Sequence, residues 1–354
     1  MTLLALETSC DETSAAVIRD GRILANVVAS QISLHAEYGG VVPELAAREH
    51  LRNLMPVVQA ALREADVSVP QLEAIAATRG PGLPNALLTG FKAAQAMAFA
   101  LRKPFLGINH HEAHLYSPWI SGTPPVADFA AFQPNVSLIV SGGHTMLVHV
   151  AGELQHRVLG STLDDAAGEC FDKTGKLISL PYPAGPVIDR LAETGNPKAY
   201  HFPRPLMNDA NDDFSFSGLK TSIRYFLRDH LGLADDPQQL RDLCASVQAA
   251  IVEVLVTKTI KAAKRLGVRC VTASGGVTCN GALRRQFAAA CARNQLTLRL
   301  AEKHLCTDNA AMIGILAERI LLQRPHAGFQ PDDGDVLPNW SLDETPPEIL
   351  APVD

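Results

Sequence analysis

The sequence contains few aromatic side chains, no long apolar run and no excess of positive charge. Aromatic residues make up 5% of its 354 residues, and only two of them are tryptophan. No segment offers the ~18 consecutive apolar residues of a membrane-spanning helix, so we expect no membrane association. The net charge of −6 argues against a protein that binds nucleic acid over its whole surface. If RNA is a substrate, local basic patches or a partner protein must supply the positive field.

Export signals and disulfide patterns are missing as well. The N-terminus carries no basic residue ahead of its first apolar run, and Asp11 and Glu12 follow soon after, which is typical of a first strand rather than of a signal peptide. Seven cysteines are scattered along the chain, and none forms a C-x-x-C pair that would indicate a zinc knuckle or a redox motif. Free thiols are compatible with a reducing compartment, so these features predict a cytoplasmic protein.

The length of the chain predicts two lobes. A single hydrophobic core usually stops growing at ~250 to 300 residues, and this chain has 354. The segment 118–135 is rich in proline and lacks periodicity, so we place the lobe boundary there. One predicted lobe comprises residues 1–117 plus 307–354, and the other comprises residues 118–306.

Both predicted lobes have the order of elements found in α/β proteins. Residues 3–18 and 136–150 each contain two apolar runs around a small polar turn, which predicts two similar β-hairpins and indicates an internal duplication. Residues 72–101 and 268–293 each have the pattern of a strand, a glycine-rich turn and a helix. The sequence therefore predicts an α/β fold.

Two other segments have less regular patterns. Residues 44–65 repeat apolar side chains at helical spacing, and Pro56 within them predicts either a kinked helix or a helical hairpin. The tail from Arg324 is rich in proline and acidic residues, which predicts mostly solvated coil.

Three histidines lie within five residues of one another in the segment 109–117, where a helix is predicted to begin. His110 and His114 are four residues apart, so they project within ~40° of each other on one helix face and could share a cation. Packing of one ring and solvation of the other explains the spacing equally well. Glu112 is turned ~200° from each of them, so the H-E-x-x-H geometry of zinc peptidases is absent.

Acidic residues elsewhere also allow two interpretations. Asp308 precedes a run of helical periodicity, so it stands near a helix N-terminus, where a carboxylate is more often a cap than a metal ligand. The segment 164–173 is acidic and amphipathic, which is typical of a solvated helix face.

Glycine-rich turns and basic stripes are the remaining features with a chemical interpretation. The turns 141–144 and 274–280 let a backbone approach an anionic ligand closely, although neither has the glycine spacing of Walker or Rossmann loops. Basic residues recur along the segments 220–228 and 258–265. Such stripes are usually solvated faces, and contact with an RNA backbone is the alternative.

Taken together, the motifs resemble those of one known family. They cover nearly the whole chain and stand in the family's order: LETSCDETS, GGVVPELAAREH, RGPGL, NHHEAHL, VSGGHT, DDAAGECFDKTGKL, YPAGP, FSFSGLKT, SGGVTCN and CTDNAAM. They resemble the TsaD family of tRNA N6-adenosine threonylcarbamoyltransferases, formerly described as O-sialoglycoprotein endopeptidases. The resemblance implies two actin-like lobes of the ASKHA, RNase H-like type, with a ligand cleft between them.

The same resemblance implies the residues of the site. Those that match the family's metal ligands are His110, His114 and Asp308, with one divalent metal per chain, Fe²⁺ as the usual ion and Zn²⁺ as the alternative. Those that match its substrate-binding positions are Ile139, Val140, Ser141, Gly142, Gly143, Asp172, Gly185, Asp189 and Asn280. An adenine nucleotide is expected at the latter.

The implied reaction transfers a threonylcarbamoyl group from threonylcarbamoyl-adenylate to N6 of the adenosine beside the anticodon of tRNAs that read ANN codons, with release of AMP. The implied partners are tRNA, a paralogous TsaB-like subunit and a TsaE-like ATPase. Two departures from the family's pattern are Pro84-Asn85 after the RGPGL turn and Asn339 before the terminal Trp-x-Leu. A peptidase and a non-enzymatic nucleotide-binding subunit are the alternative classes.

Overall fold

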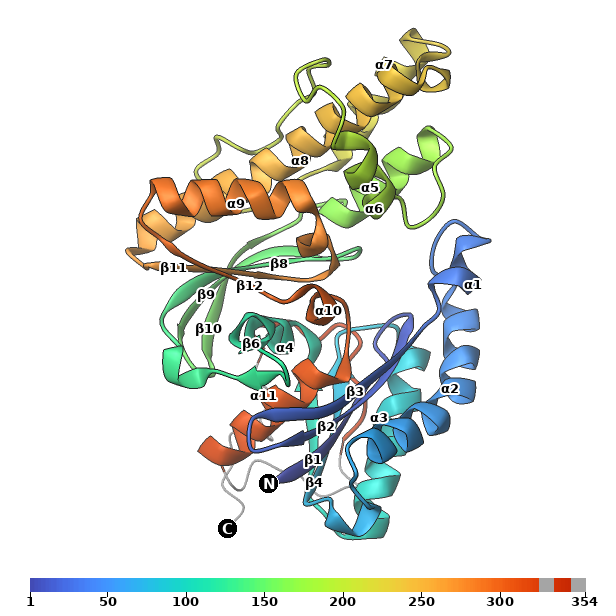
Figure 1. Cartoon of the computed structure of the whole chain (residues 1–354), viewed down its shortest axis with the longest axis vertical. Helices are drawn as coiled ribbons and strands as arrows, with labels where there is room; N and C mark the ends of the chain where they lie inside the picture. Colours follow the sequence, from blue (N-terminus) through green and yellow to red (C-terminus); the bar gives the residue numbers. More distant parts are fainter. Residues whose placement is uncertain (325–333, 345–354) are drawn as a thin grey trace. The chain divides into compact units, whose positions relative to one another are not determined.

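The computed structural model describes residues 1–324 and 334–344, which fold as two compact units (Figure 1). Unit 1 combines residues 1–132 with the chain from residue 308 onward, and unit 2 comprises residues 133–307. Unit 1 is therefore discontinuous in sequence, whereas unit 2 is one continuous segment.

Unit 1 is built on a seven-stranded sheet in the order β5-β4-β1-β2-β3-β7-β6. The first three strands form an antiparallel meander, and β4 and β5 run parallel to β1. The strands are β1 (Thr2–Glu7), β2 (Glu12–Arg19), β3 (Arg22–Ser30), β4 (Ala74–Gly80), β5 (Phe105–Asn109), β6 (Ile120–Ser121) and β7 (Val126–Ala127).

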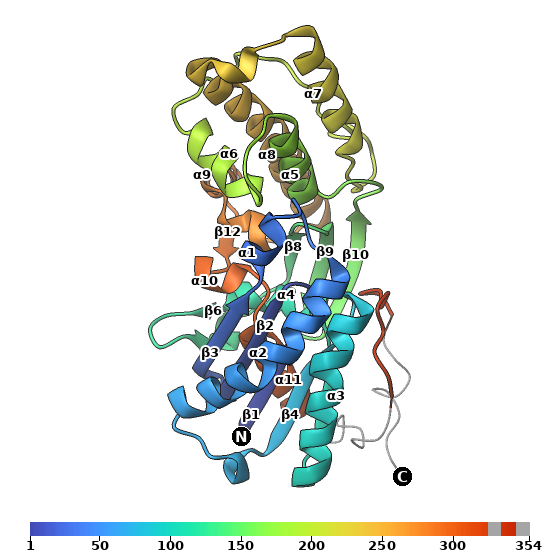
Figure 2. The same ribbon diagram turned by 90° about the vertical axis from the view of Figure 1, so that its right-hand side faces the viewer.

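Helices cover both faces of this sheet (Figure 2), which explains why every residue of β1 is buried and its four central residues are apolar. Because side chains alternate between the faces of a strand, Leu4 and Leu6 pack with the buried residues of two helices, and Ala5 lies against Gly314 of another. The helices of unit 1 are α1 (Ile32–Ala36), α2 (Pro43–Glu64), α3 (Pro84–Leu101), α4 (His110–Tyr116) and α11 (Ala310–Gln323), with short 3₁₀ turns at Val69–Gln71, Ser117–Trp119 and Phe129–Ala131.

Unit 2 has a five-stranded sheet in the order β10-β9-β8-β11-β12. Its strands are β8 (Asn135–Val140), β9 (Thr145–Gly152), β10 (Gln155–Ser161), β11 (Cys270–Ser274) and β12 (Thr297–Leu300). Its helices are α5 (Ala167–Leu177), α6 (Ala184–Ala192), α7 (Ser217–Asp229), α8 (Pro237–Leu266), α9 (Gly281–Arg293) and α10 (Lys303–Cys306), with 3₁₀ turns at Leu233–Asp235 and Gly276–Cys279.

One helix of the described chain, α8, is long and apolar enough to cross a membrane. Within unit 2, however, 83% of its most apolar window is buried, and its residues from Leu243 to Ala263 supply much of the hydrophobic core. Its composition is therefore that of a central core helix.

The five strands β5-β4-β1-β2-β3 of unit 1 and β12-β11-β8-β9-β10 of unit 2 have the same order and directions. In each unit an antiparallel meander comes first, and two parallel strands follow beside its first strand. The two predicted hairpins are present, and the shared topology supports the duplication inferred from them.

Several boundaries differ from those expected from sequence. Helix α2 continues through Pro56, so the helical-hairpin alternative is wrong. Residues 118–132 belong to unit 1, rather than to the second lobe to which the sequence pattern assigned them, because β7 pairs with β3 and the rings of Trp119 and Phe132 lie 4.7 Å apart. The return to unit 1 begins at Asp308.

Residues 334–344 are coil and mostly exposed or half-buried, as expected, but two of their side chains are buried. There, Trp340 and Leu342 are 6% and 5% exposed, and the Leu337 N–H donates to the Arg79 carbonyl over 2.8 Å. Pro338 accepts a hydrogen bond from the Gly82 N–H at 3.1 Å. This segment is therefore hydrogen-bonded to the end of β4 and to the turn that follows it. The rest of the predicted coil, residues 325–333 and 345–354, lies outside the described residues.

This contact predicts the effect of a small substitution in the turn. A Cβ added at Gly80 would lie 1.9 Å from the Leu337 carbonyl oxygen, which is backbone and cannot rotate away. We expect Gly80→Ala to lower the free energy of unfolding by about 1–3 kcal/mol and to shift the fluorescence of Trp340 to longer wavelength as the segment moves. Urea denaturation and emission spectra measure both. In the control Gly218→Ala, an added Cβ has no heavy atom within 4 Å, and similar losses in the two variants would contradict this account.

Candidate metal centre and other candidate sites

Helix α4 begins where β5 ends, so its first turn lies at the carboxyl end of the sheet. The side chain of Asn109 caps it by accepting hydrogen bonds from the His111 and Glu112 N–H groups at 2.9 and 3.1 Å. With the helix start held in this way, His110 and His114 lie one turn apart and their ring centres are separated by 4.8 Å. The predicted common face of the two rings is present.

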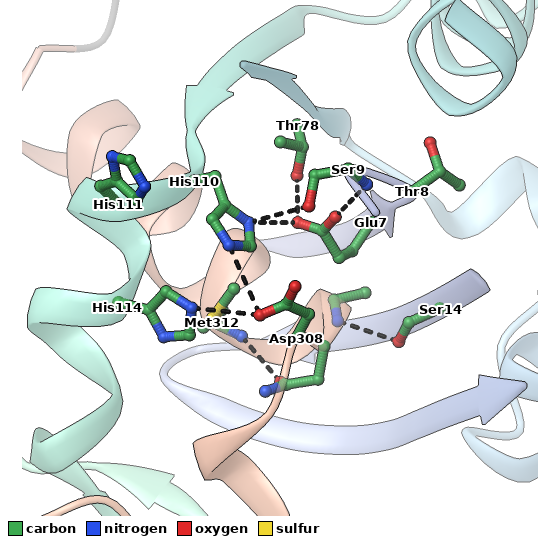
Figure 3. Close-up of polar contacts among 12 residues, drawn as sticks. Glu7, Thr8, Ser9, Ser14, Thr78, His110, His111, His114, Asp308 and Met312 are labelled. Atoms are coloured by element: carbon green, nitrogen blue, oxygen red, sulfur yellow. Dashed lines mark hydrogen bonds and ion pairs between the residues drawn. The ribbon is translucent and has the colours of Figure 1, made fainter. Parts of the chain in front are cut away.

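Asp308 lies beside these two rings (Figure 3). Its Oδ1 is 3.4 Å from His110 Nε2 and 3.2 Å from His114 Nε2. The cap of α11 is supplied instead by Asn309, whose side chain accepts from the Met312 N–H at 3.2 Å. The capping explanation for Asp308 is therefore wrong, and its carboxylate is available to the histidines.

The three side chains have the donor set of a metal site. One ligand atom from each lies within 4.8 Å of the others, and the side chains are largely buried. Two imidazoles and one carboxylate suit Zn²⁺ or Fe²⁺ and leave coordination positions open. His114 Nδ1 is buried without a hydrogen-bond partner in the described chain, so the contact of Nε2 with Asp308 is what orients that ring. The residues present fit a divalent transition metal.

Electrostatics favour a cation at this position. Burial opposes ionisation of Asp308, but the neighbouring His110 and His114 hold its pKa well below its usual range. Burial by itself would lower the pKa of His110. The negative charges of Asp308 and Glu7 have the larger effect and hold this pKa well above its usual value. Burial lowers the pKa of His114, which favours its neutral, ligand-competent form. The carboxylates thus create a negative potential that stabilises positive charge.

Glu112 is not part of the cluster. It comes from the outward side of α4 and is partly exposed, as its helical position predicted. His111 is buried but also contributes no ligand atom to the cluster. Glu112 is therefore not placed as the glutamate that a zinc peptidase uses as its base.

The two glycine turns of unit 2 meet at the ends of their strands. Ser141 to His144 form a tight turn closed by a 2.8 Å hydrogen bond from the Ser141 N–H to the His144 carbonyl. Gly275 has φ of 92°, and an added Cβ would lie 2.3 Å from the Val140 carbonyl oxygen, so only glycine allows this approach. Gly142 and Gly143 have open space where side chains would be. The backbone there is accessible to a ligand.

The other predicted substrate-binding residues have structural partners. Asp172 accepts from the Ala184 and Gly185 N–H groups at 2.7 and 3.4 Å, which caps α6. Asp189 Oδ2 accepts from the Gly281 N–H at 2.8 Å, and Asn280 caps α9 through the Leu283 N–H at 2.9 Å. Asp189 Oδ1 is buried without a partner in the described chain, so it remains free to accept a hydrogen bond. The ligand roles of Ile139, Val140, Ser141, Gly142, Gly143, Asp172, Gly185, Asp189 and Asn280 stay predictions.

The acidic segment 164–173, which includes the first turns of α5, is largely buried or half-buried rather than a solvated face, although Asp164 itself is exposed. Asp164 accepts hydrogen bonds from the Phe216 and Ser217 N–H groups and from the Ser215 hydroxyl. Burial opposes its ionisation, but these donors lower the pKa of Asp164 to about 2. The FSFSGLKT loop is thereby held at the start of α7.

Most basic side chains of the segments 220–228 and 258–265 bind other residues of the protein. Lys220 forms an ion pair with Asp165 at 2.6 Å. In α8, Lys258 is 2% exposed and donates to the Leu206 carbonyl, while Lys261 donates to the Met207 carbonyl. Lys264 donates to Asn294, and Arg265 pairs with Asp212. The solvated-face interpretation is therefore wrong for the buried Lys258 and holds for Lys261, Lys264 and Arg265, which are exposed and also bind neighbouring loops.

A thiol pair in unit 2 was not detectable from sequence, because its members are far apart along the chain. Cys279 forms a hydrogen bond with Cys306, and this contact, with the charges of Arg284 and Lys303, lowers the pKa of the Cys279 thiol to about 7 despite burial. The Arg284 guanidinium donates to Cys306 Sγ at 3.3 Å. All other cysteines have a raised pKa.

Comparison with known proteins gives consistent matches. The family model TsaD, described as tRNA N6-adenosine threonylcarbamoyltransferase, matches residues 22–315. A tRNA N6-adenosine threonylcarbamoyltransferase of Geotalea uraniireducens is 50% identical over 344 residues, covering 97% of each chain. That of Chloroherpeton thalassium is 52% identical over 330 residues, covering 90% of this chain and 91% of its own.

Solved structures support the fold. HypF from T. kodakarensis aligns with a TM-score of 0.59 at 13% identity, over 91% of this chain and 48% of its own. The ROK hexokinase of Thermus thermophilus aligns with a TM-score of 0.52 at 15% identity, over 91% of this chain and 100% of its own. At such identities only the fold is shown, and the predicted α/β fold of actin-like type is confirmed.

The cluster predicts the metal content of variants. We expect His110→Ala, His114→Ala and Asp308→Ala each to weaken metal binding by at least tenfold while secondary structure is retained, because the site lies at the edge of the core and each change removes one ligand. Metal analysis after gel filtration and circular dichroism measure these. His111→Ala changes a buried histidine of the same helix and should keep its metal. Stoichiometric metal in purified His110→Ala would refute the assignment.

The low pKa of one thiol predicts selective alkylation. Because the thiolate is the nucleophile, the rate of modification of Cys279 by iodoacetamide should rise with pH through about 7 and level off above it. The other six thiols should react more slowly throughout. Mass spectrometry of peptides after short exposures at a series of pH values measures each rate. A Cys306→Ala variant removes the hydrogen bond and should shift the Cys279 profile to higher pH, whereas an unchanged profile would contradict the assigned cause.

Proposed function

Because the chain belongs to the TsaD family of tRNA N6-adenosine threonylcarbamoyltransferases, we propose that it transfers the threonylcarbamoyl group of threonylcarbamoyl-adenylate to tRNA. The acceptor is N6 of the adenosine beside the anticodon in tRNAs that read ANN codons. The N6 nitrogen forms a bond to the carbamoyl carbon, the bond from that carbon to the phosphate oxygen breaks, and N6 loses a proton. AMP leaves.

The observation that carries this proposal is the His110, His114 and Asp308 cluster in a chain that is half identical to curated transferases along almost its full length. A divalent metal, Fe²⁺ or Zn²⁺, would be held by these three side chains and would supply Lewis acidity toward the donor. One such ion per chain is expected.

The remaining residues bind and orient rather than react. We assign the adenylate half of the donor to the turn of Ser141, Gly142 and Gly143, because the open space at the two glycines lets an anion approach the backbone closely. The partnerless Asp189 Oδ1 is suited to accept a hydroxyl hydrogen of the nucleotide. Since the donor is already activated by its adenylate, positioning of N6 and stabilisation of charge supply the rate without a protein nucleophile.

The net negative charge of the chain supports a requirement for partner proteins in tRNA binding. The chain carries a net charge of −6, and Lys220 and the basic residues of α8 are engaged within the protein. Binding of tRNA depends on positive charge near its phosphates. We propose that a paralogous TsaB-like subunit and a TsaE-like ATPase complete the tRNA-binding assembly, and that it works in the cytoplasm.

The alternative classes explain less. A peptidase would place Glu112 beside the metal, and that side chain lies outside the cluster. A non-enzymatic nucleotide-binding subunit gives no reason for two buried histidines and a carboxylate to converge. The transferase accounts for the metal ligands and the glycine turns together.

A transfer assay tests the proposal. Purified protein, unmodified tRNA, labelled threonine, the donor-forming enzyme and the two partners should yield labelled tRNA with release of one AMP per group transferred. The isolated chain should transfer at a small fraction of this rate at physiological salt, because the positive field is missing. Labelled tRNA with an unmodified anticodon-adjacent adenosine, or no labelling in the full mixture, would reject the proposed reaction. Full turnover by the chain alone would reject the need for partners.

A further inference from the structure

A buried carboxylate lies on the far side of His110 from the metal ligands. Glu7, the last residue of β1, is 0% exposed, and its Oε2 is 3.0 Å from His110 Nδ1. The other ring nitrogen, Nε2, is directed at Asp308 (Figure 3). Glu7 is not among the clustered residues, and it contacts the ring nitrogen opposite to the one that lies against Asp308.

The carboxylate of Glu7 is itself held rigidly. Its Oε1 accepts from the Ser9 N–H at 2.5 Å, and its Oε2 accepts from the Thr78 hydroxyl on β4 at 2.5 Å. Both partners donate, so the carboxylate acts as an acceptor toward them. A side chain fixed at both oxygens presents a defined direction to the His110 ring.

This acceptor determines which nitrogen of His110 carries hydrogen. A neutral imidazole has one N–H and one lone pair, and only the lone pair binds a metal. In the neutral ring that binds a cation, an Nδ1–H that donates to Glu7 leaves the lone pair on Nε2, which is directed toward Asp308. Ser9 Oγ also lies 3.2 Å from Nδ1. It does not fix the tautomer by itself, because a hydroxyl can either donate a hydrogen bond to the ring nitrogen or accept one from it.

We propose that Glu7 is the positioning residue of the metal centre: it fixes the orientation and the Nδ1–H tautomer of His110 so that Nε2 binds the cation. This inference rests on the proposed metal-dependent function. Partners of this kind contribute ~10- to 100-fold in metal affinity. Glu7 therefore links metal binding to the carboxyl ends of β1 and β4.

The test measures metal affinity directly, without a transfer assay. Metal-free wild-type protein and Glu7→Gln are titrated with Zn²⁺ in competition with a chromophoric chelator. The amide of Gln can turn its NH₂ toward Nδ1 and favour the wrong tautomer, so we expect an affinity ~10- to 100-fold weaker with an unchanged melting temperature. The matched control is Glu318→Gln, which alters another buried carboxylate of unit 1 that accepts from the Gly21 N–H at 2.7 Å. Its affinity should remain within about twofold of wild type.

A second measurement needs no variant and decides the question if Glu7→Gln fails to fold. Nitrogen NMR of the Zn²⁺-loaded wild-type protein should show His110 bound through Nε2 with a hydrogen on Nδ1. Binding through Nδ1, or equal affinities in wild type and Glu7→Gln, overturns the role of Glu7 and leaves the metal site standing. Failure of the wild-type protein to bind metal overturns the metal centre of the proposed function and this inference with it.

Discussion

Parallel pairing among β1, β4 and β5 is the constraint on which the candidate metal centre depends. In parallel strands the carboxyl ends lie at the same edge of the sheet. Glu7 ends β1, Thr78 lies near the end of β4, and His110 follows the last residue of β5. Residues widely separated in sequence thus meet because Leu6 pairs with Ala77 and Gly80 with Asn109. Helix α11 then brings Asp308 to the same edge from the other end of the chain.

The elements of regular pattern could be predicted from the sequence, and the long-range contacts could not. The helix over 281–293 is found at those residues, and the two histidines share the face that their spacing indicated. Asp308, in contrast, was more easily explained as a cap, but Asn309 fills that role. The family resemblance, rather than any local pattern, predicted Asp308 as a ligand, and its position beside the two histidine rings is compatible with that prediction.

Errors arose where a distant segment changed the environment of a residue. Trp340 and Leu342 lie in a segment whose composition is typical of coil, but the turn after β4 offers them backbone partners and a surface. Lys258 has the helical spacing of an exposed stripe, yet the loop that carries Leu206 covers it. Propensity and periodicity describe a residue's neighbours along the chain, whereas burial depends on neighbours in space.

The discontinuity of unit 1 has a consequence for how the protein is made. Synthesis proceeds from the N-terminus, and domains generally fold as units. Unit 2 is contiguous and is complete when residue 307 has emerged from the ribosome, but the first 132 residues then still lack α11 against their sheet. His110 and His114 acquire their carboxylate partner only after residue 308 has been synthesised. The metal binding proposed above would therefore follow the completion of unit 2, and a nascent chain truncated before residue 308 would lack one of the three proposed ligands.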